Sequence, residues 1–245
     1  MEFKDRRVWI TGASSGIGEA LAVAFHQAGA KLALSARRED ELKRVQTLCG
    51  GEPNTRIIPM DVTNAVELPE KTQLVLGIFN GIDILVLNAG ITQRSLTRET
   101  GESVYRRLME VNFFASEAMA RAVLPSMLAQ KSGHMVVISS IAGKFGVPLR
   151  SGYSASKFAL HGFFEVLRAE EEKNGIHVTM VCPGYIQTDI SLSALRGDGA
   201  KHAKMDPGIS QGMPAEECAR RILKAVARCK QEIIVGLNKS GDWFI

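Results

Sequence analysis

Short apolar runs alternate with amphipathic stretches along almost the whole chain. Each apolar run fits a buried strand, and each amphipathic stretch has apolar residues three and four apart, as on one face of a helix. This alternation predicts parallel strands joined by right-handed helical crossovers. The expected strands are 7–10, 31–35, 56–60, 83–87, 134–139, 177–181 and 232–235, and the expected helices are a first one ending near 28, then 39–48, 103–130, 153–173 and 215–228.

The pattern predicts one α/β domain over residues 1–245, a doubly wound (Rossmann-like) sheet of seven parallel strands with helices on both faces. One stretch departs from the alternation. Residues 188–213 are too long for a plain connection and too polar for a core, and they contain the turn-like segments 196–199 and 206–208. We expect this stretch to form a mobile lid over a substrate site.

Composition narrows the class of protein. Hydrophobic residues make up 45% and charged residues 23% of the 245, as in ordinary soluble proteins. No apolar run reaches the ~18 residues of a membrane span. Because the N-terminal residues enter a strand at once, we expect no signal peptide. The net charge of +4 is mild and aromatics are only 6%, so we expect no nucleic-acid partner.

Cysteine and histidine patterns bear on compartment and metal binding. The cysteines at 49, 182, 218 and 229 are scattered and form no C-x-x-C pair. In a chain of this size they indicate reduced thiols and a cytoplasmic protein. The five histidines are also scattered, with no H-E-x-x-H motif, so no metal site is predicted.

A glycine-rich segment, residues 11–18, lies between the first strand and the first helix. Gly12, Gly16 and Gly18 follow the spacing G-x-x-x-G-x-G. Glycines at such a place allow a tight turn and a close approach of the backbone to a pyrophosphate, and the helix N-terminus supplies free amides. The alternative is a turn that merely needs glycine. Because the segment opens the first helix of an alternating chain, we favour a dinucleotide site.

Tyr153 and Lys157 stand four residues apart in a helical pattern and therefore share one face of the helix. An ammonium ~4 Å from a phenol, at an effective dielectric near 20, is worth about 4 kcal/mol. We expect this to lower the tyrosine pKa from ~10 towards 7, so that the phenol can exchange a proton at working pH. Ser140 would end a strand, where its hydroxyl could bond a substrate oxygen; Ser139 is its rival. The alternative is an ordinary surface helix.

Further motifs accompany these in a fixed order. They are Asp61-Val62 after the third strand, Asn88-Ala89-Gly90 after the fourth, Asn112 in the long helix and Pro183-Gly184 after the sixth. Together with the glycine segment, Ser140 and the Tyr153/Lys157 pair, they resemble the short-chain dehydrogenase/reductase family. The likeness runs from residue 5 to about residue 236. The stretch 188–213 and the tail after Gly236 carry no family signature.

The resemblance implies roles for individual residues. Tyr153 would be the general acid/base and Ser140 would orient the substrate carbonyl. Lys157 would lower the tyrosine pKa and bind the nicotinamide ribose, and Asn112 would hold a water through its backbone carbonyl. Asp61 would contact adenine, Asn88 would tie the central strands, and Thr188 would meet the carboxamide. The residues expected to bind the dinucleotide are Gly12, Ser14, Ser15, Gly16, Ile17, Gly18, Arg37, Arg38, Asp61, Val62, Asn88, Ala89, Gly90, Tyr153, Lys157, Pro183, Gly184, Ile186 and Thr188.

Cofactor choice is decided where the second strand ends, near the adenosine ribose. An enzyme that prefers NAD has a carboxylate at this position, which accepts hydrogen bonds from the ribose hydroxyls. This chain has Ala36 instead, followed by Arg37 and Arg38. A guanidinium suits a 2′-phosphate. We therefore predict NADP(H), chiefly through Arg37, with NAD(H) as the alternative, because Glu39 and Asp40 come next and Ser15 stands where many NADP-preferring relatives have a basic residue.

These patterns predict an oxidoreductase that moves hydride between a nicotinamide and a carbonyl or secondary alcohol. The alternatives are a non-catalytic dinucleotide-binding protein and a sugar-nucleotide epimerase or dehydratase. An apolar substrate is suggested by Phe145, Val147, Leu149, Ile190, Leu192 and Leu195, which could equally pack within the lid.

The apolar surfaces of helices 103–130 and 153–173 predict a homodimer or homotetramer, because they exceed what one core contact needs and, by resemblance, pair across a two-fold axis. The apolar tail 241–245 is expected to pack on a neighbouring subunit.

Overall fold

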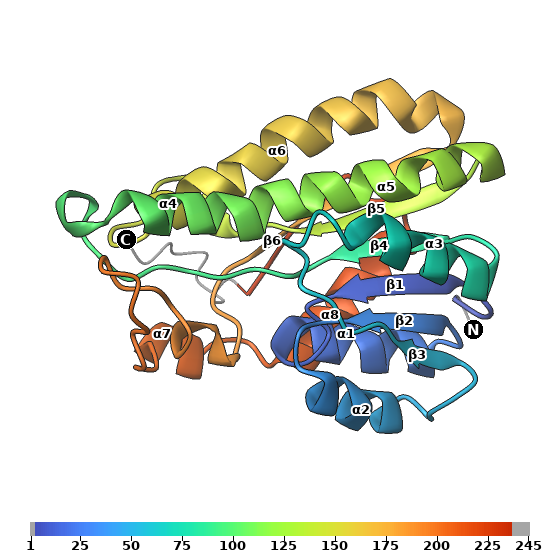
Figure 1. Ribbon diagram of the computed structural model, residues 1–245, viewed down its shortest axis with the longest axis horizontal. Coiled ribbons are helices and arrows are strands. Elements are labelled where there is room, and N and C mark those ends of the chain that lie inside the picture. The colour runs from blue at the N-terminus through green and yellow to red at the C-terminus, as the bar shows by residue number, and fades with distance from the viewer. Residues whose placement is uncertain (1–2, 237–245) are drawn as a thin grey trace.

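The computed structural model describes residues 3–236, which form one parallel sheet covered by helices on both faces (Figure 1). The sheet has seven strands in the order β3-β2-β1-β4-β5-β6-β7. This confirms the predicted doubly wound fold. The strands are β1 Arg7–Thr11, β2 Lys31–Ser35, β3 Thr55–Ile57, β4 Ile84–Leu87, β5 Gly133–Ile138, β6 Ile176–Pro183 and β7 Glu232–Val235.

Helices form a layer on each side of the sheet. In Figure 1, α4, α5 and α6 lie along one side, and α1, α2 and α8 lie along the other. Two apolar clusters fill the spaces between these layers and the sheet. The α-helices are α1 Gly16–Gln27, α2 Glu39–Leu48, α3 Leu68–Phe79, α4 Glu102–Met109, α5 Ala115–Gln130, α6 Ser151–Glu171, α7 Pro207–Ser210 and α8 Ala215–Val226.

The central strand β1 shows why the strands read as continuous apolar runs. Val8 and Ile10 point into the cluster under α1 and α8, while Trp9 between them points into the cluster under α3, α5 and α6. All three side chains are fully buried. The Trp9 indole N–H donates to Ser35 Oγ at 2.9 Å, which satisfies its one polar atom. Because both faces of the sheet are covered, no strand position has to be polar.

The long helix expected over 103–130 is interrupted. Helix α4 ends at Met109, a five-residue π-turn follows over Glu110–Phe114, and α5 begins at Ala115. Asn112 lies within the π-turn, and asparagine is a poor residue for a regular helix interior. The prediction of one continuous helix was therefore wrong at its centre.

Other boundaries also differ from the sequence predictions. Helix α3 was not among the predicted ranges; its first turn carries a proline, which is tolerated there because that N–H has no helical partner. The third strand was expected over 56–60, but β3 ends at Ile57. Beyond it Ile58 and Met60 still donate to the backbone of the second-strand region, and Pro59 between them supplies no N–H.

Residues 188–213, the lid segment, pack against the chain that follows β4. Leu195 donates to the carbonyl of Thr92 and accepts from the N–H of Arg94, each at 2.8 Å. The segment includes the short helix α7, which Figure 1 shows beyond the carboxyl ends of the strands. The structure thus places it over the end of the sheet where ligands bind in such folds. Its mobility stays a prediction.

Two further sequence predictions concern the C-terminal tail and the presence of membrane-spanning helices. The tail 241–245 lies outside the described residues. Within residues 3–236, no helix combines the length and the apolar character needed to cross a bilayer.

Candidate active site

A cavity of about 710 Å³ opens at the carboxyl ends of the central strands. It brings together residues from segments far apart in the sequence. All the residues predicted to bind the dinucleotide line it except Gly18, and Ser140 lines it as well. Ala36 and Ser139 also line it, as do three of the six apolar residues suggested for the substrate, Ile190, Leu192 and Leu195. The lining residues for which the sequence predicted no role are Met60, Ile91, Thr92, Arg94, Arg107, Val111, Ile138, Arg150, Tyr185, Asp189, Ser193, Lys201 and Ile209.

The glycine segment forms a tight turn in which Gly12 and Gly18 have no room for a side chain. Gly12 has φ +63°, and a Cβ on it would lie 2.8 Å from Asn88 Nδ2. A Cβ on Gly18 would lie only 2.2 Å from the carbonyl oxygen of Gly12. Gly18 therefore serves the close packing of α1 on the turn, which explains why it does not line the cavity.

Asn88 holds the glycine segment against the central strands. Its Nδ2 donates to the carbonyls of Thr11 and Gly12 at 3.1 and 3.0 Å. Its backbone N–H, and that of Ala89, donate to Thr11 Oγ1. The amide thus spans β1 and the end of β4, as predicted from the sequence resemblance.

The N-terminus of α1 fits a dinucleotide phosphate. The Ser15 side chain, at the N-cap, makes no capping hydrogen bond, so the first-turn amides have no side-chain partner. Glycine removes any Cβ that would block approach, and the dipole of α1 favours a negative charge here. The residues present therefore suit the pyrophosphate of a nicotinamide dinucleotide.

The ribose end of the cavity carries two arginines and no carboxylate at the end of β2. Ala36 is buried there, and Arg37 and Arg38 line the cavity. Arg38 Nη2 donates to Ser14 Oγ at 3.1 Å and to Ser15 Oγ at 3.0 Å. The sequence reasoning gave the leading role to Arg37, but Arg38 is the arginine that contacts the glycine segment.

Tyr153 is enclosed beside Ser140, with 8% of its surface exposed. Burial raises the pKa of the phenol, while a hydrogen bond with Ser140 and the charges of Arg150 and Arg94 act to lower it. The expectation of a tyrosine pKa lowered by Lys157 is therefore wrong for this structure. The reason is geometric: Lys157 Nζ lies 5.7 Å from the centroid of the Tyr153 ring and donates instead to the carbonyl of Ile138 at 2.8 Å.

Lys157 is itself almost completely buried. Burial lowers the pKa of its ammonium to about 8. A lysine with such a pKa still carries its charge at neutral pH, and it lines the cavity together with Tyr153. The two side chains from α6 therefore share one space, as their spacing of four residues predicts.

Ser139 and Ser140 both follow β5, but their hydroxyls have different partners. Ser140 Oγ accepts from the backbone N–H of Ala142 at 3.1 Å, donates to the carbonyl of Pro183 at 3.4 Å, and is close enough to Tyr153 to act on the pKa of the phenol. Ser139 Oγ donates to the carbonyl of Lys157 at 3.3 Å and lies 3.2 Å from His161 Nε2. Ser140 is thus the serine placed beside the phenol, which supports its choice over Ser139.

Asn112 joins the π-turn to its surroundings. Its Nδ2 donates to the carbonyl of Ile91 at 3.0 Å and to Ser156 Oγ at 2.8 Å, and its Oδ1 accepts from the N–H of Ile91 at 2.8 Å. Its backbone carbonyl accepts from Ser116 Oγ at 3.2 Å. Asn112 therefore links the end of β4 to α6 near the cavity without lining it; its predicted role in holding a water stays a prediction.

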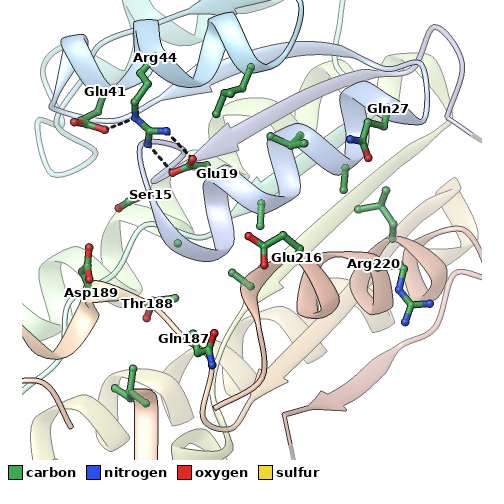
Figure 2. Close-up of a pocket in the computed structure, with 18 of the residues that line it drawn as sticks. Ser15, Glu19, Gln27, Glu41, Arg44, Gln187, Thr188, Asp189, Glu216 and Arg220 are labelled. Atoms are coloured by element: carbon green, nitrogen blue, oxygen red, sulfur yellow. Dashed lines mark hydrogen bonds and ion pairs between the residues drawn. The ribbon is translucent and has the colours of Figure 1, made fainter. Parts of the chain in front are cut away.

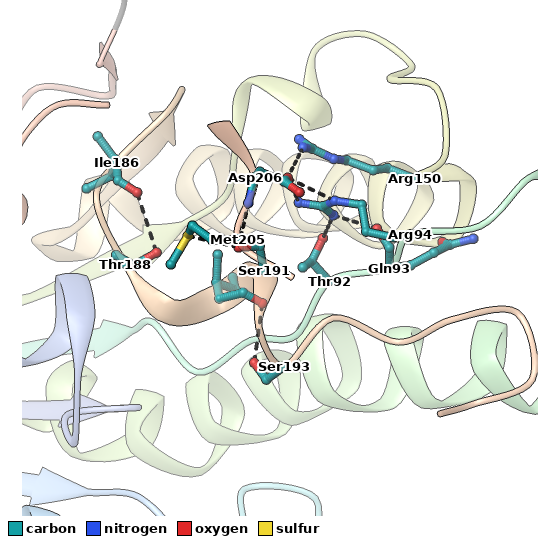
Figure 3. A network of polar contacts seen from close by, with 11 residues as sticks. Thr92, Gln93, Arg94, Arg150, Ile186, Thr188, Ser191, Ser193, Met205 and Asp206 are labelled. Atoms are coloured by element: carbon teal, nitrogen blue, oxygen red, sulfur yellow. Dashed lines mark hydrogen bonds and ion pairs between the residues drawn. The ribbon is translucent and has the colours of Figure 1, made fainter. Parts of the chain in front are cut away.

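A buried ionic network faces the same cavity and was missed by the sequence reasoning. Arg94 Nε and Nη2 both donate to Asp206 Oδ2, the former at 2.9 Å, and Arg150 Nη2 donates to the same oxygen at 3.1 Å (Figure 3). Arg94 follows β4, Arg150 precedes α6 and Asp206 belongs to the lid segment. No motif spacing relates these residues, so only the fold brings them together.

A second cavity, of about 1440 Å³, lies next to the glycine segment between α1 and α8 (Figure 2). Three of its charged groups form one cluster, in which Arg44 bonds Glu19 at 2.7 and 2.8 Å and Glu41 at 2.8 Å. It is larger than the first cavity, but it contains none of Ser140, Tyr153 and Lys157. The chemistry therefore belongs to the smaller cavity.

One group of side chains within residues 3–236 has the composition of a metal site, namely His161, Cys182 and Glu232. Glu232 pairs with Lys144 at 2.5 Å, and the two ring nitrogens of His161 point to different partners, Nε2 to Cys182 and Nδ1 to Glu165. These contacts describe a hydrogen-bonded network. The prediction that the protein holds no metal stays a prediction.

Comparisons with known proteins agree with this geometry. A dehydrogenase/reductase SDR family protein 7-like from Anopheles gambiae is 47% identical over 93% of this chain and 74% of its own length. The mouse (Mus musculus) dehydrogenase/reductase SDR family member 7B is 38% identical over 93% of this chain and 72% of its own length.

Solved structures share the fold. The crystal structure of a short-chain dehydrogenase from Streptomyces avermitilis has a TM-score of 0.84 and 30% identity, over 95% of this chain and 89% of that one. A Burkholderia phymatum short chain dehydrogenase/reductase in complex with NAD has a TM-score of 0.85 at 24% identity, over 96% and 90% of the two chains, and shows the fold alone.

The family model for short chain dehydrogenases matches residues 6–197. That match covers both the glycine segment and the Tyr153/Lys157 pair. With the relatives above, it shows that the chain belongs to the short-chain dehydrogenase/reductase family and is an NAD(P)-dependent oxidoreductase.

Proposed function

We propose that this protein moves hydride between NADP(H) and a carbonyl or secondary alcohol, with Tyr153 as the general acid/base. The observation that carries the proposal is the placement of the phenol, which lies in one cavity with the glycine segment, beside Ser140 and on the same helix face as Lys157. The bound nicotinamide supplies or accepts the hydride. The side chains of this chain handle the proton.

In the reducing direction Tyr153 donates its proton to the carbonyl oxygen while Ser140 donates a hydrogen bond to that oxygen. Because burial raises the pKa of the phenol, it is protonated throughout the neutral range and ready to act as an acid. The charges of Arg150 and Arg94, which act to lower the pKa of the phenol, then stabilise the phenolate that forms. In the oxidising direction the same groups work in reverse.

The direct test is Tyr153→Phe. We expect this variant to lose more than about 99% of turnover, because a proton transfer of this kind contributes roughly a hundredfold or more. Its NADPH affinity, measured by fluorescence titration, should persist. Tyr105→Phe is the matched control, since its hydroxyl lies 2.9 Å from Ser151 Oγ outside the cavity. Retention of more than a few per cent of activity by Tyr153→Phe would exclude the assigned role.

The preference for NADP(H) is proposed from the charge at the ribose end. No carboxylate ends β2, and Arg37 and Arg38 line the cavity, with Arg38 bonded to both serines of the glycine segment. Guanidinium groups suit a 2′-phosphate through charge-assisted hydrogen bonds. Ala36→Asp combined with Arg37→Ile should shift kcat/KM towards NADH. A higher kcat/KM with NADH than with NADPH in the unmodified protein would contradict the proposal.

We also propose that the protein is cytoplasmic and forms a homodimer or homotetramer. Phe114, Phe158 and Val166 on the outer helix layer are each about half exposed, at 48%, 45% and 55%. Such apolar surface on neighbouring helices favours a symmetric contact between copies. A monomer by light scattering at micromolar concentration would contradict the assembly.

A further inference from the structure

The buried ionic network described above bears on what the cavity binds. Arg94 and Arg150 both line the cavity that holds Tyr153, and their side chains are only 7% and 18% exposed. Figure 3 shows both guanidinium groups directed at Asp206. Two partly buried cations share one carboxylate, so the network carries a net positive charge. Burying such a charge is costly unless a further partner compensates it.

The two arginines differ in how many of their donors are used. Arg94 donates to Asp206 through Nε and Nη2. Its Nη1 donates to Thr92 Oγ1 at 3.0 Å and to the carbonyl of Gln93 at 2.5 Å. Arg150 donates only through Nη2, to Asp206 at 3.1 Å. Within residues 3–236 no hydrogen bond is made by Nε or Nη1 of Arg150. These nitrogens are the donor atoms of the network left for a ligand, and a hydrogen bond from a guanidinium to an oxyanion is charge-assisted and strong.

Other charged groups around the cavity do not cancel this excess. Lys201 adds a positive charge to the lining, and His202 lies close enough to Asp206 to act on its pKa. Asp189, the acidic residue of the lid segment that lines this cavity, lies towards the glycine segment, near Thr188 and Ser15 (Figure 2). The part of the cavity nearest Arg150 is therefore cationic.

This cationic part is close to the reacting group. The charges of Arg150 and Arg94 both act to lower the pKa of the Tyr153 phenol, against the larger effect of burial. An anion held by Arg150 would thus lie near the carbonyl that Tyr153 protonates. The apolar side chains of Ile91, Leu192 and Leu195 line the same cavity and suit the rest of such a molecule.

Building on the proposed function, we propose that the carbonyl substrate carries an oxyanion, a carboxylate or a phosphate, which Arg150 binds through the N–H groups that Asp206 does not use. Asp206 stays paired with Arg94. Its hydrogen bond from Arg150 Nη2 also holds the Arg150 guanidinium in a fixed orientation. The oxyanion then sets the distance and direction of the carbonyl towards Tyr153 and Ser140. An entirely apolar substrate, as the sequence suggested, would leave the excess charge of the network uncompensated.

The first test uses the unmodified protein with matched ketones. Phenylpyruvate is compared with its methyl ester, and hydroxyacetone phosphate with hydroxyacetone, all with NADPH. We expect kcat/KM to be at least about tenfold higher for the charged member of a pair, because hydrogen bonds to a charged group discriminate by that much or more. The two pairs separate a carboxylate from a phosphate. Equal or higher kcat/KM for both neutral members overturns the proposal.

The second test changes the arginine. Arg150→Gln should lower kcat/KM for the preferred charged ketone at least about tenfold, mainly through KM, and change that for its neutral partner by less than about threefold. Arg150→Lys should restore only part of the loss, since a lysine lacks the paired donors. Arg228→Gln, which removes an exposed charge outside the cavity, is the control. An equal loss on charged and neutral ketones would show that Arg150 acts only on the fold or on Tyr153.

Binding separates failure of this inference from failure of the proposed function. Calorimetric titration of phenylpyruvate and of hydroxyacetone phosphate into the protein with NADP⁺ should show binding of at least one, lost in Arg150→Gln. That result supports the oxyanion site even if no ketone is reduced, in which case the proposed reaction fails alone. No binding of either anion, or binding unaffected by Arg150→Gln, overturns the inference whatever the turnover.

Discussion

The two ends of the cavity are built in opposite ways. The dinucleotide end is shaped by backbone: two glycines with positive φ, a helix N-terminus and one amide, Asn88, that holds the turn. The substrate end is shaped by charged side chains, Arg94, Arg150 and Asp206, from three separate segments. The first design tolerates almost no change of residue type. The second can change its ligand by changing a few side chains on an unchanged backbone.

The largest effect should come from filling the backbone turn with Gly18→Ala. The new Cβ would lie 2.2 Å from the carbonyl oxygen of Gly12, so α1 or the turn has to move. We expect about 3 kcal/mol or more of lost stability by denaturant titration, together with at least about a tenfold loss of NADPH affinity.

Gly77→Ala is the matched control for that change. Gly77 lies in α3 and a Cβ there meets nothing within 4 Å. Alanine is the better helix former, so this variant should gain up to about 1 kcal/mol. If Gly18→Ala were as well tolerated as Gly77→Ala, the contrast between a backbone-built and a side-chain-built end would fail.

A smaller effect is expected from Asp206→Asn at the substrate end. Removing the carboxylate leaves two buried guanidinium groups without their shared counter-charge. Because Asp206 is 19% exposed, we discount the cost of a fully buried pair and expect a loss of about 2 kcal/mol. NADPH affinity should stay within about threefold of the original value. Asp198→Asn is the control, since its pair with Arg196 is more than half exposed; an equal loss in both would remove the network's structural role.

Lys157→Met should have the smallest effect on stability and the opposite sign. The pKa of Lys157 is about 8 in the folded protein against 10.5 ordinarily, so the unfolded chain binds the proton more tightly and stability falls as pH drops from 10.5 to 8. At pH 7 the buried ammonium therefore costs up to about 3 kcal/mol. Allowing for its lost bond to Ile138, we expect methionine to stabilise the fold by about 1 kcal/mol at pH 7, while turnover and NADPH affinity both fall.

The pH dependence of the melting temperature checks this last prediction. The gain from Lys157→Met should shrink as pH rises from 8 towards 10.5, because the native lysine is neutral in this range and the lysine of the unfolded chain loses its proton towards the upper end. A lower melting temperature for Lys157→Met across the whole pH range would contradict this prediction, because it would show that the lysine stabilises the fold.

The same contrast explains what could be predicted from the sequence. Strand β2 and helix α2 begin and end where the apolar pattern placed them, because local periodicity determines such elements. Gly12 could be placed because a nucleotide-binding turn demands glycine at fixed spacing, and Asn88 because the chain resembles the short-chain dehydrogenase/reductase family. Arg94, Arg150 and Asp206 obey no spacing, since any three segments that meet in space could supply them.

One error arose, and one contact was not predicted, where tertiary environment outweighs local pattern. The pKa of Tyr153 depends on enclosure and on arginines distant in sequence, so the neighbour four residues away was a poor guide. Arg37 and Arg38 are adjacent and chemically equal in the sequence, and only the direction in which β2 ends brings Arg38 to Ser14 and Ser15.

The π-turn at Glu110–Phe114 also has a consequence for how this protein can change. One residue added to a helical turn rotates everything beyond it by about 100°. Helix α4 therefore presents Val104 and Leu108 to the wall that holds Tyr153, while α5 presents Met119 and Val123 to the sheet. The inserted residue therefore sets the rotation of α5 relative to α4 about the helix axis. Substitutions in α4 can therefore change the shape of the cavity beside Tyr153 without disturbing the packing of α5 on the sheet. The cavity and the core can change independently during evolution.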